Sequence, residues 1–374
     1  MVLAPSALED EAVPEGVKIL ETLIVRDAKR LPREGIREIL VRGTNWIGDA
    51  VMTLPALTAI RKTWPQAQIS ILAKPWVADV YRESNDVDRI LNFEDPGRHQ
   101  GPFGKIRLAG ELRQYPFDMA ILLQNAIEAA IIARLAGIPI RAGYDSDARG
   151  WLLTHAVRRT PAIRKIHQID YYLEMVKALG CDSAGRNLRL NLRSDTRSLA
   201  DEWLKVRESA HQMIIGMAPG ATYGPAKRWP VDRFSAVAAE IIKEYGATTI
   251  ILFGSKQDQK VTDAIETAIQ GHCLNLAGKT SVREVIALIA HCHAFITNDS
   301  GLMHVAGALN VPTVAIFGST NPITTSPPGD RNIIIRKPVD CSPCLKTDCP
   351  TDFRCMNLIG VAEVVDAVRQ AIKT

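Results

Sequence analysis

The sequence predicts an α/β protein with two halves, each built around a parallel sheet. Short apolar runs rich in β-branched residues alternate with helical patterns, and this alternation restarts near residue 190. The length of 374 residues also exceeds the usual size of one domain. We therefore expect two Rossmann-like domains, at 37–192 and 193–356, with an extension at 1–36 and a final helical segment at 357–374.

Several apolar runs in the first half are expected to be strands. They lie at Glu38–Arg42, Gln68–Leu72, Arg89–Phe93, Met119–Leu123 and around Arg141–Gly143. The N-terminal extension is polar and contains prolines, and we expect one helix in it, around Lys18–Val25.

The second half repeats the pattern. Its expected strands lie at Met213–Met217, Thr248–Phe253, Ala294–Thr297, Thr313–Phe317 and Asn332–Ile335. Its expected helices lie at Thr196–Val206, Asp232–Tyr245, around Val261–Ile269, after the capping box Ser281–Glu284 and from Leu302. The final helix, around Val361–Ile372, has an apolar face that must be buried.

The composition describes a globular protein and excludes several functional classes. The net charge of +4 does not indicate nucleic-acid binding, and no nucleic-acid-binding motif is present. No apolar run approaches the roughly 18–20 residues that span a bilayer. Acidic residues precede any apolar run, which is untypical of a signal peptide. Seven cysteines, mostly crowded near one end, do not resemble an extracellular disulfide pattern, so we expect a cytoplasmic protein.

The loop after the first strand carries a candidate catalytic carboxylate, Asp49. Gly43 and Gly48 let the backbone approach a ligand, and ligands of α/β sheets bind beyond the carboxyl ends of strands. The loop lacks the G-x-G-x-x-G pattern of dinucleotide-binding proteins. Were Asp49 a helix N-cap, Pro55 would disrupt the helix at a cost of about 3 kcal/mol. We therefore expect a helix that begins nearer Met52 and leaves Asp49 in the loop, although the capping role stays open.

Two loops of the second half predict a diphosphate site. The loop after the strand at Met213–Met217 supplies small residues, the hydroxyl of Thr222 and the positive charges of Lys227 and Arg228. A solvated surface turn is the alternative for this loop. The other loop, Asn298–Gly301, leads directly into a helix, whose unpaired N–H groups and positive dipole end attract an anion.

Two side chains near this second helix start, His304 and Asp299, are expected to have separate roles in the site. His304 lies one turn along the helix, where it reaches a phosphate or else is a hydrogen-bonded core histidine. Asp299 would repel a phosphate and is better suited to accept hydrogen bonds from sugar hydroxyls. Lys227, Thr222 and the helix start at Ser300–Gly301 together hold the diphosphate, so no divalent metal or other cofactor is required.

Two further patterns resemble metal sites. Asp145-Ser-Asp147 mimics the D-x-D motif of metal-dependent transferases, but it lies in the wrong half for this diphosphate site. Four cysteines form a local group: Cys341, Cys344, Cys349 and Cys355. Because C-x₂-C is half of a zinc knuckle, the four thiols could bind a structural zinc. Disulfides formed on oxidation and free buried thiols are the alternatives.

Three segments in the same order resemble a known family. They are Asn45–Met52 (NWIGDAVM), Pro219–Pro230 (PGATYGPAKRWP) and Thr297–His304 (TNDSGLMH). They are similar to the ADP-heptose:lipopolysaccharide heptosyltransferases, glycosyltransferase family 9, and most like the heptosyltransferase II branch. The resemblance covers about residues 37–374. The extension and the cysteine-rich segment depart from the family pattern without touching these motifs.

The resemblance implies a GT-B fold, in which two facing Rossmann-like domains enclose an interdomain cleft. The donor would bind mainly the C-terminal domain and the acceptor the N-terminal one, and the last helix would pack back toward the N-terminal domain. The family position of the base corresponds to Asp49, with Asn45 and Gly48 near the reaction centre. Family positions for the donor's phosphates and heptose correspond to Thr222, Lys227, Asp299, Ser300, Gly301 and His304.

The resemblance also implies the reaction. It is an inverting, metal-independent transfer of L-glycero-D-manno-heptose from ADP-heptose onto the inner-core heptose of lipopolysaccharide, with heptosyl-Kdo-lipid A as acceptor. The enzyme would work at the cytoplasmic face of the inner membrane, in peripheral contact with it and without nucleic acid. The acceptor is anionic, and none of the basic residues that could meet it is singled out: Arg61, Lys62, Arg158, Arg159, Arg164 and Lys165.

Other functions remain open at this point. A heptosyltransferase I- or III-like enzyme would use a different acceptor. A sugar-nucleotide 2-epimerase of the same fold would need no acceptor. A non-enzymatic nucleotide-binding module is disfavoured because Asp49 and the anion-binding loops lie on opposite halves.

Overall fold

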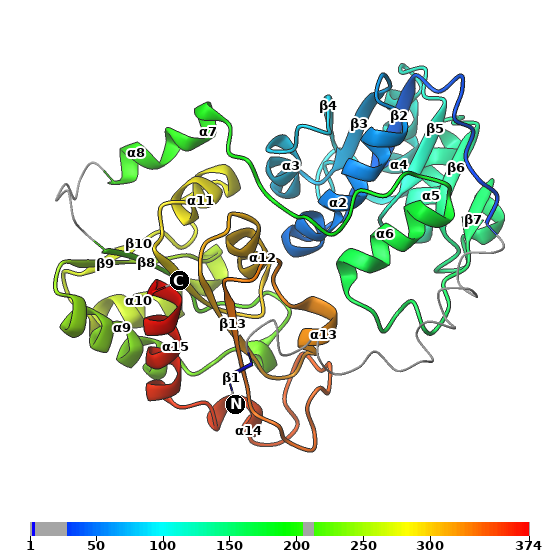
Figure 1. Cartoon of the computed structure of the whole chain (residues 1–374). Helices are drawn as coiled ribbons and strands as arrows, with labels where there is room; N and C mark the ends of the chain where they lie inside the picture. Colours follow the sequence, from blue (N-terminus) through cyan, green and yellow to red (C-terminus); the bar gives the residue numbers. More distant parts are fainter. Residues whose placement is uncertain (1, 4–27, 205–212, 374) are drawn as a thin grey trace. The chain divides into compact units, whose positions relative to one another are not determined.

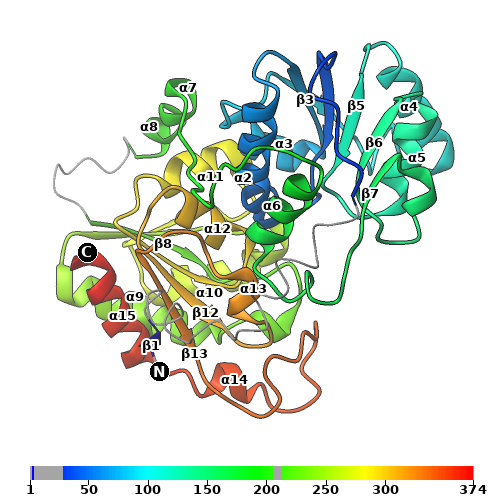
Figure 2. The ribbon, with the colours of Figure 1, turned by 45° about the vertical axis from the view of Figure 1, so that its right-hand side comes forward.

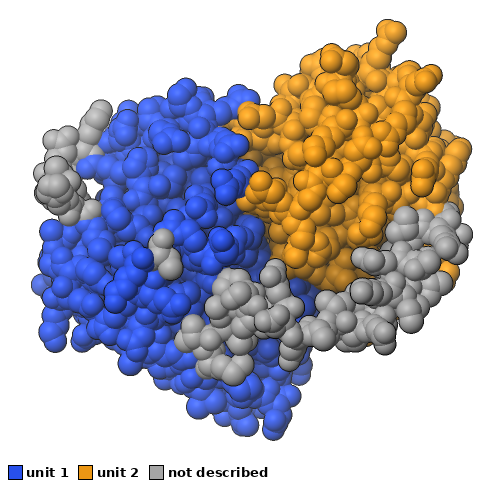
Figure 3. Space-filling model, in the orientation of Figure 1, with its two compact units in different colours: residues 1–12, 189–374 blue, residues 13–188 orange. Residues whose placement is uncertain are grey.

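The contacts within the chain divide it into two compact units (Figures 1 and 3). The computed structural model describes residues 2–3, 28–204 and 213–373. The N-terminal unit spans 13–188, and the C-terminal unit comprises 189–374 together with 1–12. The helix expected at Lys18–Val25 lies outside the described residues.

The N-terminal unit is built on a six-stranded parallel sheet of order β4-β3-β2-β5-β6-β7. The strands are β2 (Glu38–Arg42), β3 (Gln68–Ala73), β4 (Arg89–Asn92), β5 (Met119–Leu122), β6 (Ile140–Tyr144) and β7 (His155–Val157). Counted along the chain, this is the 3-2-1-4-5-6 order of a dinucleotide-binding fold. The sequence analysis found every strand except β7, whose three residues are too few to show a periodic pattern.

Helices cover both faces of this sheet (Figure 2). One layer contains α2 (Ile47–Thr63), α3 (Pro75–Arg82) and α6 (Gln168–Ala178), and the other contains α4 (Gly101–Leu112) and α5 (Ile127–Leu135). A 3₁₀ turn, η2 (Gly150–Leu152), precedes β7. Because both faces are covered, the central strands are buried along nearly their whole length, which explains their continuous apolar runs.

The C-terminal unit repeats this arrangement. Its parallel strands follow the order β13-β12-β11-β8-β9-β10, and β1 (Val2–Leu3) pairs antiparallel with β13 at one edge. The parallel strands are β8 (Met213–Ala218), β9 (Thr248–Leu252), β10 (Cys273–Asn275), β11 (Ala294–Asn298), β12 (Thr313–Phe317) and β13 (Asn332–Arg336). Of these, only the short β10 was not predicted. The prediction of two α/β halves is confirmed.

The helices of this unit also form two layers. One includes α9 (Val231–Tyr245), α10 (Gln259–Ala268) and α15 (Val361–Lys373), and the other includes α11 (Val282–Ile289) and α12 (Gly301–Ala308). Shorter elements are α7 (Ser194–Arg197), α8 (Leu199–Leu204), η4 (Pro225–Lys227), η5 (Lys256–Asp258), α13 (Pro322–Thr325) and α14 (Arg354–Asn357). The capping box predicted at Ser281 is present, with Glu284 as its partner. The helix expected at Thr196–Val206 is two short helices, α7 and α8.

The last helix, α15, packs on the sheet and helices of its own unit. Its apolar face, with Val364 and Val368 fully buried, shares one core cluster with Phe234 and Ile241 of α9. It also contacts β11, β12 and β13. The apolar stripe is therefore covered within its own unit.

Part of the predicted N-terminal extension belongs to the N-terminal unit. Leu31 is buried, and its backbone N–H donates to the carbonyl of Leu179 at 2.9 Å. Arg33 forms an ion pair with Asp182 at 2.8 Å. The expected boundary at residue 36 is therefore too late, because polar sequence hid these long-range contacts.

Within 28–204 and 213–373, no helix is both long and apolar enough to cross a membrane.

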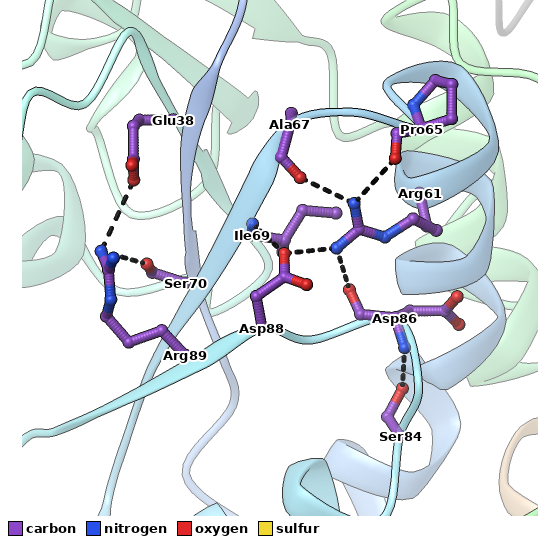
Figure 4. Close-up of polar contacts among 10 residues, drawn as sticks. All are labelled: Glu38, Arg61, Pro65, Ala67, Ile69, Ser70, Ser84, Asp86, Asp88 and Arg89. Carbon is purple, nitrogen blue, oxygen red and sulfur yellow. Dashed lines mark hydrogen bonds and ion pairs between the residues drawn. The ribbon is translucent and has the colours of Figure 1, made fainter.

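Arg61, one of the basic residues considered for the acceptor, is committed to the fold (Figure 4). From the last turn of α2 its guanidinium donates to the carbonyl of Ala67 at 2.7 Å and to the carbonyl of Asp86 at 3.2 Å. It also contacts the carboxylate of Asp88 at 2.5 Å, which in turn accepts from the N–H of Ile69. These bonds tie the end of α2 to the start of β3.

We expect Arg61→Ala to lower the free energy of unfolding of the N-terminal unit by about 2 kcal/mol, because several hydrogen bonds to a charged group are lost. Urea denaturation measures this. Lys62→Ala is the matched control, since Lys62 is exposed and makes one long bond, 3.3 Å to the carbonyl of Ser183. Equal midpoints for the two variants would contradict the structural role of Arg61.

Candidate active site

In each sheet the order of the strands along the chain reverses between two central strands, and the predicted functional loops follow strands of this pair. In the N-terminal unit these strands are β2 and β5, and in the C-terminal unit they are β8 and β11. Crossover connections run in opposite directions from such a pair, so no helix covers their carboxyl ends. The Asp49 loop follows β2, and the two predicted diphosphate loops follow β8 and β11.

The structure corrects the local placement of Asp49. Helix α2 begins at Ile47 rather than near Met52, so Asp49 lies in the first turn of the helix and not in the loop. It is not the N-cap either, since that position is Trp46. Pro55 lies inside α2, two turns beyond its start. Most of α2 is buried, including Pro55, and this packing outweighs the cost of one missing backbone hydrogen bond.

The first turn of α2 favours a negative charge at Asp49. The positive end of the helix dipole stabilises a carboxylate there. Asp49 is partly exposed, while the neighbouring Gly48 is buried and Asn45 is partly exposed. The charge of Asp49 also acts on Tyr172 of α6, whose phenol pKa is raised well above its ordinary value, chiefly by burial and further by that charge. The phenol of Tyr172 therefore stays protonated.

A buried tyrosine fixes the loop that leads into α2. The hydroxyl of Tyr81 accepts from the N–H of Thr44 at 3.2 Å and contacts the hydroxyl of Thr53 at 3.2 Å. A side chain at Gly43 would meet the Tyr81 ring at 2.8 Å, so only glycine fits there. The loop geometry before Asp49 therefore depends on a residue of α3, which the sequence analysis did not identify.

In the C-terminal unit, Asn298 joins the two predicted diphosphate loops. Its side-chain oxygen accepts from the N–H of Trp229 at 3.1 Å, and its amide donates to the carbonyl of Pro219 at 2.7 Å. Asn298 is fully buried at the end of β11. One side chain thus holds both ends of the Pro219–Pro230 loop against the neighbouring strand.

Lys227 and Asp299, predicted separately, form an ion pair. Lys227 Nζ lies 2.6 Å from Asp299 Oδ2, and Thr320 donates its hydroxyl to the same oxygen at 2.6 Å. Asp299 is buried and the Lys227 side chain nearly so. Lys227 also lies over the ring of Tyr223, 4.7 Å from its centroid. The sequence analysis did not single out Tyr223, which lies in the same loop as Lys227, and it missed Thr320, which only the fold brings to this point.

The start of α12 has the predicted form. Ser300 is the N-cap in extended conformation, Gly301 is the first helical residue, and Ser300 Oγ lies 3.1 Å from the hydroxyl of Thr297. His304 is buried one turn along the helix. Thr222 is exposed on a turn of the β8 loop. Every predicted donor-binding residue therefore lies on the loops after β8 and β11 or in the first turn of α12.

The two patterns that resembled metal sites are not built as such. Asp145 accepts from the N–H of Arg159 at 2.7 Å, which is a local structural contact. The four thiols Cys341, Cys344, Cys349 and Cys355 line one small cavity and are free cysteines. In the described ranges, no group of three or more His, Cys, Asp or Glu residues is arranged to hold a metal ion. The geometry therefore does not support the structural zinc that the spacing suggested.

Comparison with known proteins places the chain in a family. A family model described as glycosyltransferase family 9 (heptosyltransferase) matches residues 105–353. Lipopolysaccharide heptosyltransferase 2 of Escherichia coli K12 is 32% identical over 311 residues, which cover 80% of this chain and 88% of that protein. This chain belongs to glycosyltransferase family 9. It is therefore a glycosyltransferase.

Solved structures agree with this family membership. The structure of the E. coli ADP-heptose lps heptosyltransferase II aligns with a TM-score of 0.75 and 28% identity, covering 90% of this chain and 98% of that one. A glycosyltransferase family 9 protein from Veillonella parvula aligns with a TM-score of 0.83 at 23% identity, covering 93% and 99%. The chain has the GT-B fold predicted from the resemblance.

The Lys227–Asp299 pair gives a stability prediction. We expect Lys227→Met to lower the free energy of unfolding by about 3 kcal/mol, because it leaves the buried Asp299 carboxylate without a cation. Adding Asp299→Asn should recover most of that loss, since the unpaired charge is removed. Thermal or urea denaturation of the two single variants and the double variant measures the coupling. Additive losses in the double variant would contradict a direct pairing.

Proposed function

We propose that this glycosyltransferase transfers L-glycero-D-manno-heptose from ADP-heptose to the inner-core heptose of lipopolysaccharide, with inversion at the anomeric carbon. The main support is that one carboxylate and one cationic anion site each lie at the carboxyl-edge loops of their units. Family membership and the names of the similar proteins supply the substrate class. No nucleic-acid partner is part of the proposal.

The proposed chemistry is a single displacement. An acceptor hydroxyl attacks the anomeric carbon from the face opposite the diphosphate, the bond from that carbon to the diphosphate oxygen breaks, and ADP leaves. Asp49 accepts the hydroxyl proton as the new C–O bond forms. Its place in the first turn of α2 puts it at the positive end of the helix dipole, which favours the carboxylate form that can accept a proton. Asn45 and Gly48 shape the loop around it.

The C-terminal unit is proposed to hold the donor. The N–H groups at Ser300–Gly301 and the dipole of α12 stabilise the charge that develops on the diphosphate. Lys227 adds a fixed cation and Thr222 a hydroxyl. His304 reaches a phosphate from the next turn. Asp299 anchors Lys227 through one oxygen and accepts heptose hydroxyls with the other.

The proposed reaction does not depend on a metal, because Lys227 and the start of α12 supply the positive charge at the diphosphate. We expect the rate to remain unchanged after prolonged EDTA treatment and gel filtration. Rates before and after treatment, with and without added Mg²⁺, are the measurement. A rate that collapses and returns only with a divalent cation would require a different account of leaving-group stabilisation.

The proposed location of the enzyme is the cytoplasmic face of the inner membrane, in peripheral contact with it.

The function is tested by following ADP release from ADP-heptose. Release that requires heptosyl-Kdo-lipid A, with a product heavier by one heptose, supports the proposal. Release only with Kdo-lipid A, which lacks the first heptose, points instead to a heptosyltransferase I-like acceptor. Consumption of the donor with no acceptor present would contradict glycosyl transfer.

We expect Asp49→Asn to lower kcat by about 10²–10⁴-fold while ADP affinity stays unchanged, because only proton acceptance is removed. Steady-state kinetics and calorimetric ADP titration measure the two effects. Asp232→Asn is the matched control, since Asp232 lies in the first turn of α9 and loses the same helix-dipole interaction. A near-normal rate for Asp49→Asn would assign Asp49 a structural role only.

A further inference from the structure

Close to Asp49, the N-terminal unit exposes two tryptophans. Trp46, the N-cap of α2, is 62% exposed, and Trp76, in the first turn of α3, is 42% exposed. They belong to one surface, because Trp76 Nε1 donates to the carbonyl of Asn45 at 3.3 Å. Large aromatic side chains lose much from standing in water, and neighbouring exposed ones mark binding surfaces.

A cationic cluster adjoins these two indoles. Lys74, the N-cap of α3, places Nζ 5.4 Å from the ring centroid of Trp76 and 4.8 Å from that of Phe93. Lys105 and Arg42 approach the same Phe93 ring, at 4.4 Å and 4.9 Å. Three cations therefore share one buried ring at the carboxyl ends of β2, β3 and β4.

The cluster carries more positive than negative charge. Lys105 bonds to Asp95 and lies 3.3 Å from Glu128, while Lys74 lies 3.6 Å from Asp95. Arg42 donates to backbone carbonyls and to Asn45 Oδ1 at 2.7 Å. Burial lowers the pKa of Arg42 to about 10, which leaves it charged at neutral pH. Two carboxylates thus face three cations, and an anion would be attracted to this place.

We propose that Trp46, Trp76 and Lys74 form the binding surface for an anionic sugar of the acceptor. The flat indole faces pack against C–H groups of the sugar ring, and Lys74 bonds to a phosphate or carboxylate that the sugar carries. Phe93 and Asp95 hold Lys74 in place, and Arg42 and Lys105 add positive charge beside it. This inference rests on the proposed function, because it assumes that the acceptor approaches Asp49.

The first test measures acceptor binding in aromatic variants. We expect Trp76→Ala to raise the acceptor KM about tenfold, with kcat and ADP affinity nearly unchanged. Trp76→Phe, which keeps an aromatic face, should recover most of the loss. Trp151→Ala is the matched control, because Trp151 is 77% exposed in the same unit. It lies in η2, where the carbonyl of Leu152 accepts from Arg141 near the amino end of β6, whereas Trp46 and Trp76 lie at the carboxyl ends of the strands.

The second test addresses the charge. Lys74→Met should raise the acceptor KM about 10- to 100-fold, as expected for a lost charge-assisted hydrogen bond. Asp95 keeps Lys105 as its partner, so the fold should tolerate the change. Acceptors without phosphate, or with esterified carboxylates, separate the two anions. The modification that removes the contacted group should weaken binding to the parent enzyme and have no further effect on Lys74→Met.

The outcomes separate this inference from the proposed function. If the parent enzyme transfers heptose but Trp76→Ala and Lys74→Met match Trp151→Ala in acceptor KM, the binding surface is wrong and the function stands. If the parent enzyme releases no ADP with any lipopolysaccharide acceptor, the proposed function itself fails.

Discussion

The reversal of chain direction in each sheet is the constraint on which the candidate site depends. β2 and β5 in one unit, and β8 and β11 in the other, send their connections to opposite sides. Their carboxyl ends are therefore left without a covering helix, and loops placed there can meet a ligand. The proposed base and the proposed donor-binding residues lie on these loops or in the helix turns that follow them. Lys74 and Trp76 of the proposed acceptor surface follow the neighbouring strand β3.

In the C-terminal unit, the side chains of Asn298 and Asp299 fix the loops at the carboxyl ends of β8 and β11. Asn298 holds the Pro219–Pro230 loop by two hydrogen bonds, and Asp299 holds Lys227 by an ion pair. Under the proposed function, Lys227, which Asp299 and Tyr223 already restrain, would lose little side-chain entropy when a diphosphate binds. Such preorganisation is how fixed charges stabilise a transition state without rearrangement.

The sequence predicted the strands and the loops well, and it predicted the local geometry less well. The long apolar runs located ten of the twelve parallel strands, and motif order located the loops after β2, β8 and β11. The predicted start of α2 was wrong because only the local energetic cost of Pro55 was considered, whereas burial of the helix decides where it begins. Tyr81, Thr320 and the cations around Phe93 were missed because each acts across many residues of sequence. No local pattern marks such partners, since only the parallel sheet brings them together.

The two units solve different recognition problems, and their side chains reflect this. A diphosphate is small and its charge is fixed, so a helix start and one restrained lysine are the groups proposed to bind it at α12. A glycan acceptor presents mostly hydroxyls and C–H faces, which backbone dipoles cannot distinguish from water. In the proposed acceptor surface, the exposed indoles of Trp46 and Trp76 supply flat apolar contact, and the excess charge near Lys74 favours an anionic glycan over a neutral one. Trp46 is the N-cap of the helix whose first turn contains Asp49, so a sugar that packs on this indole would be positioned by the same backbone as the proposed base. The proposals for acceptor binding and for proton transfer therefore both depend on one turn of α2.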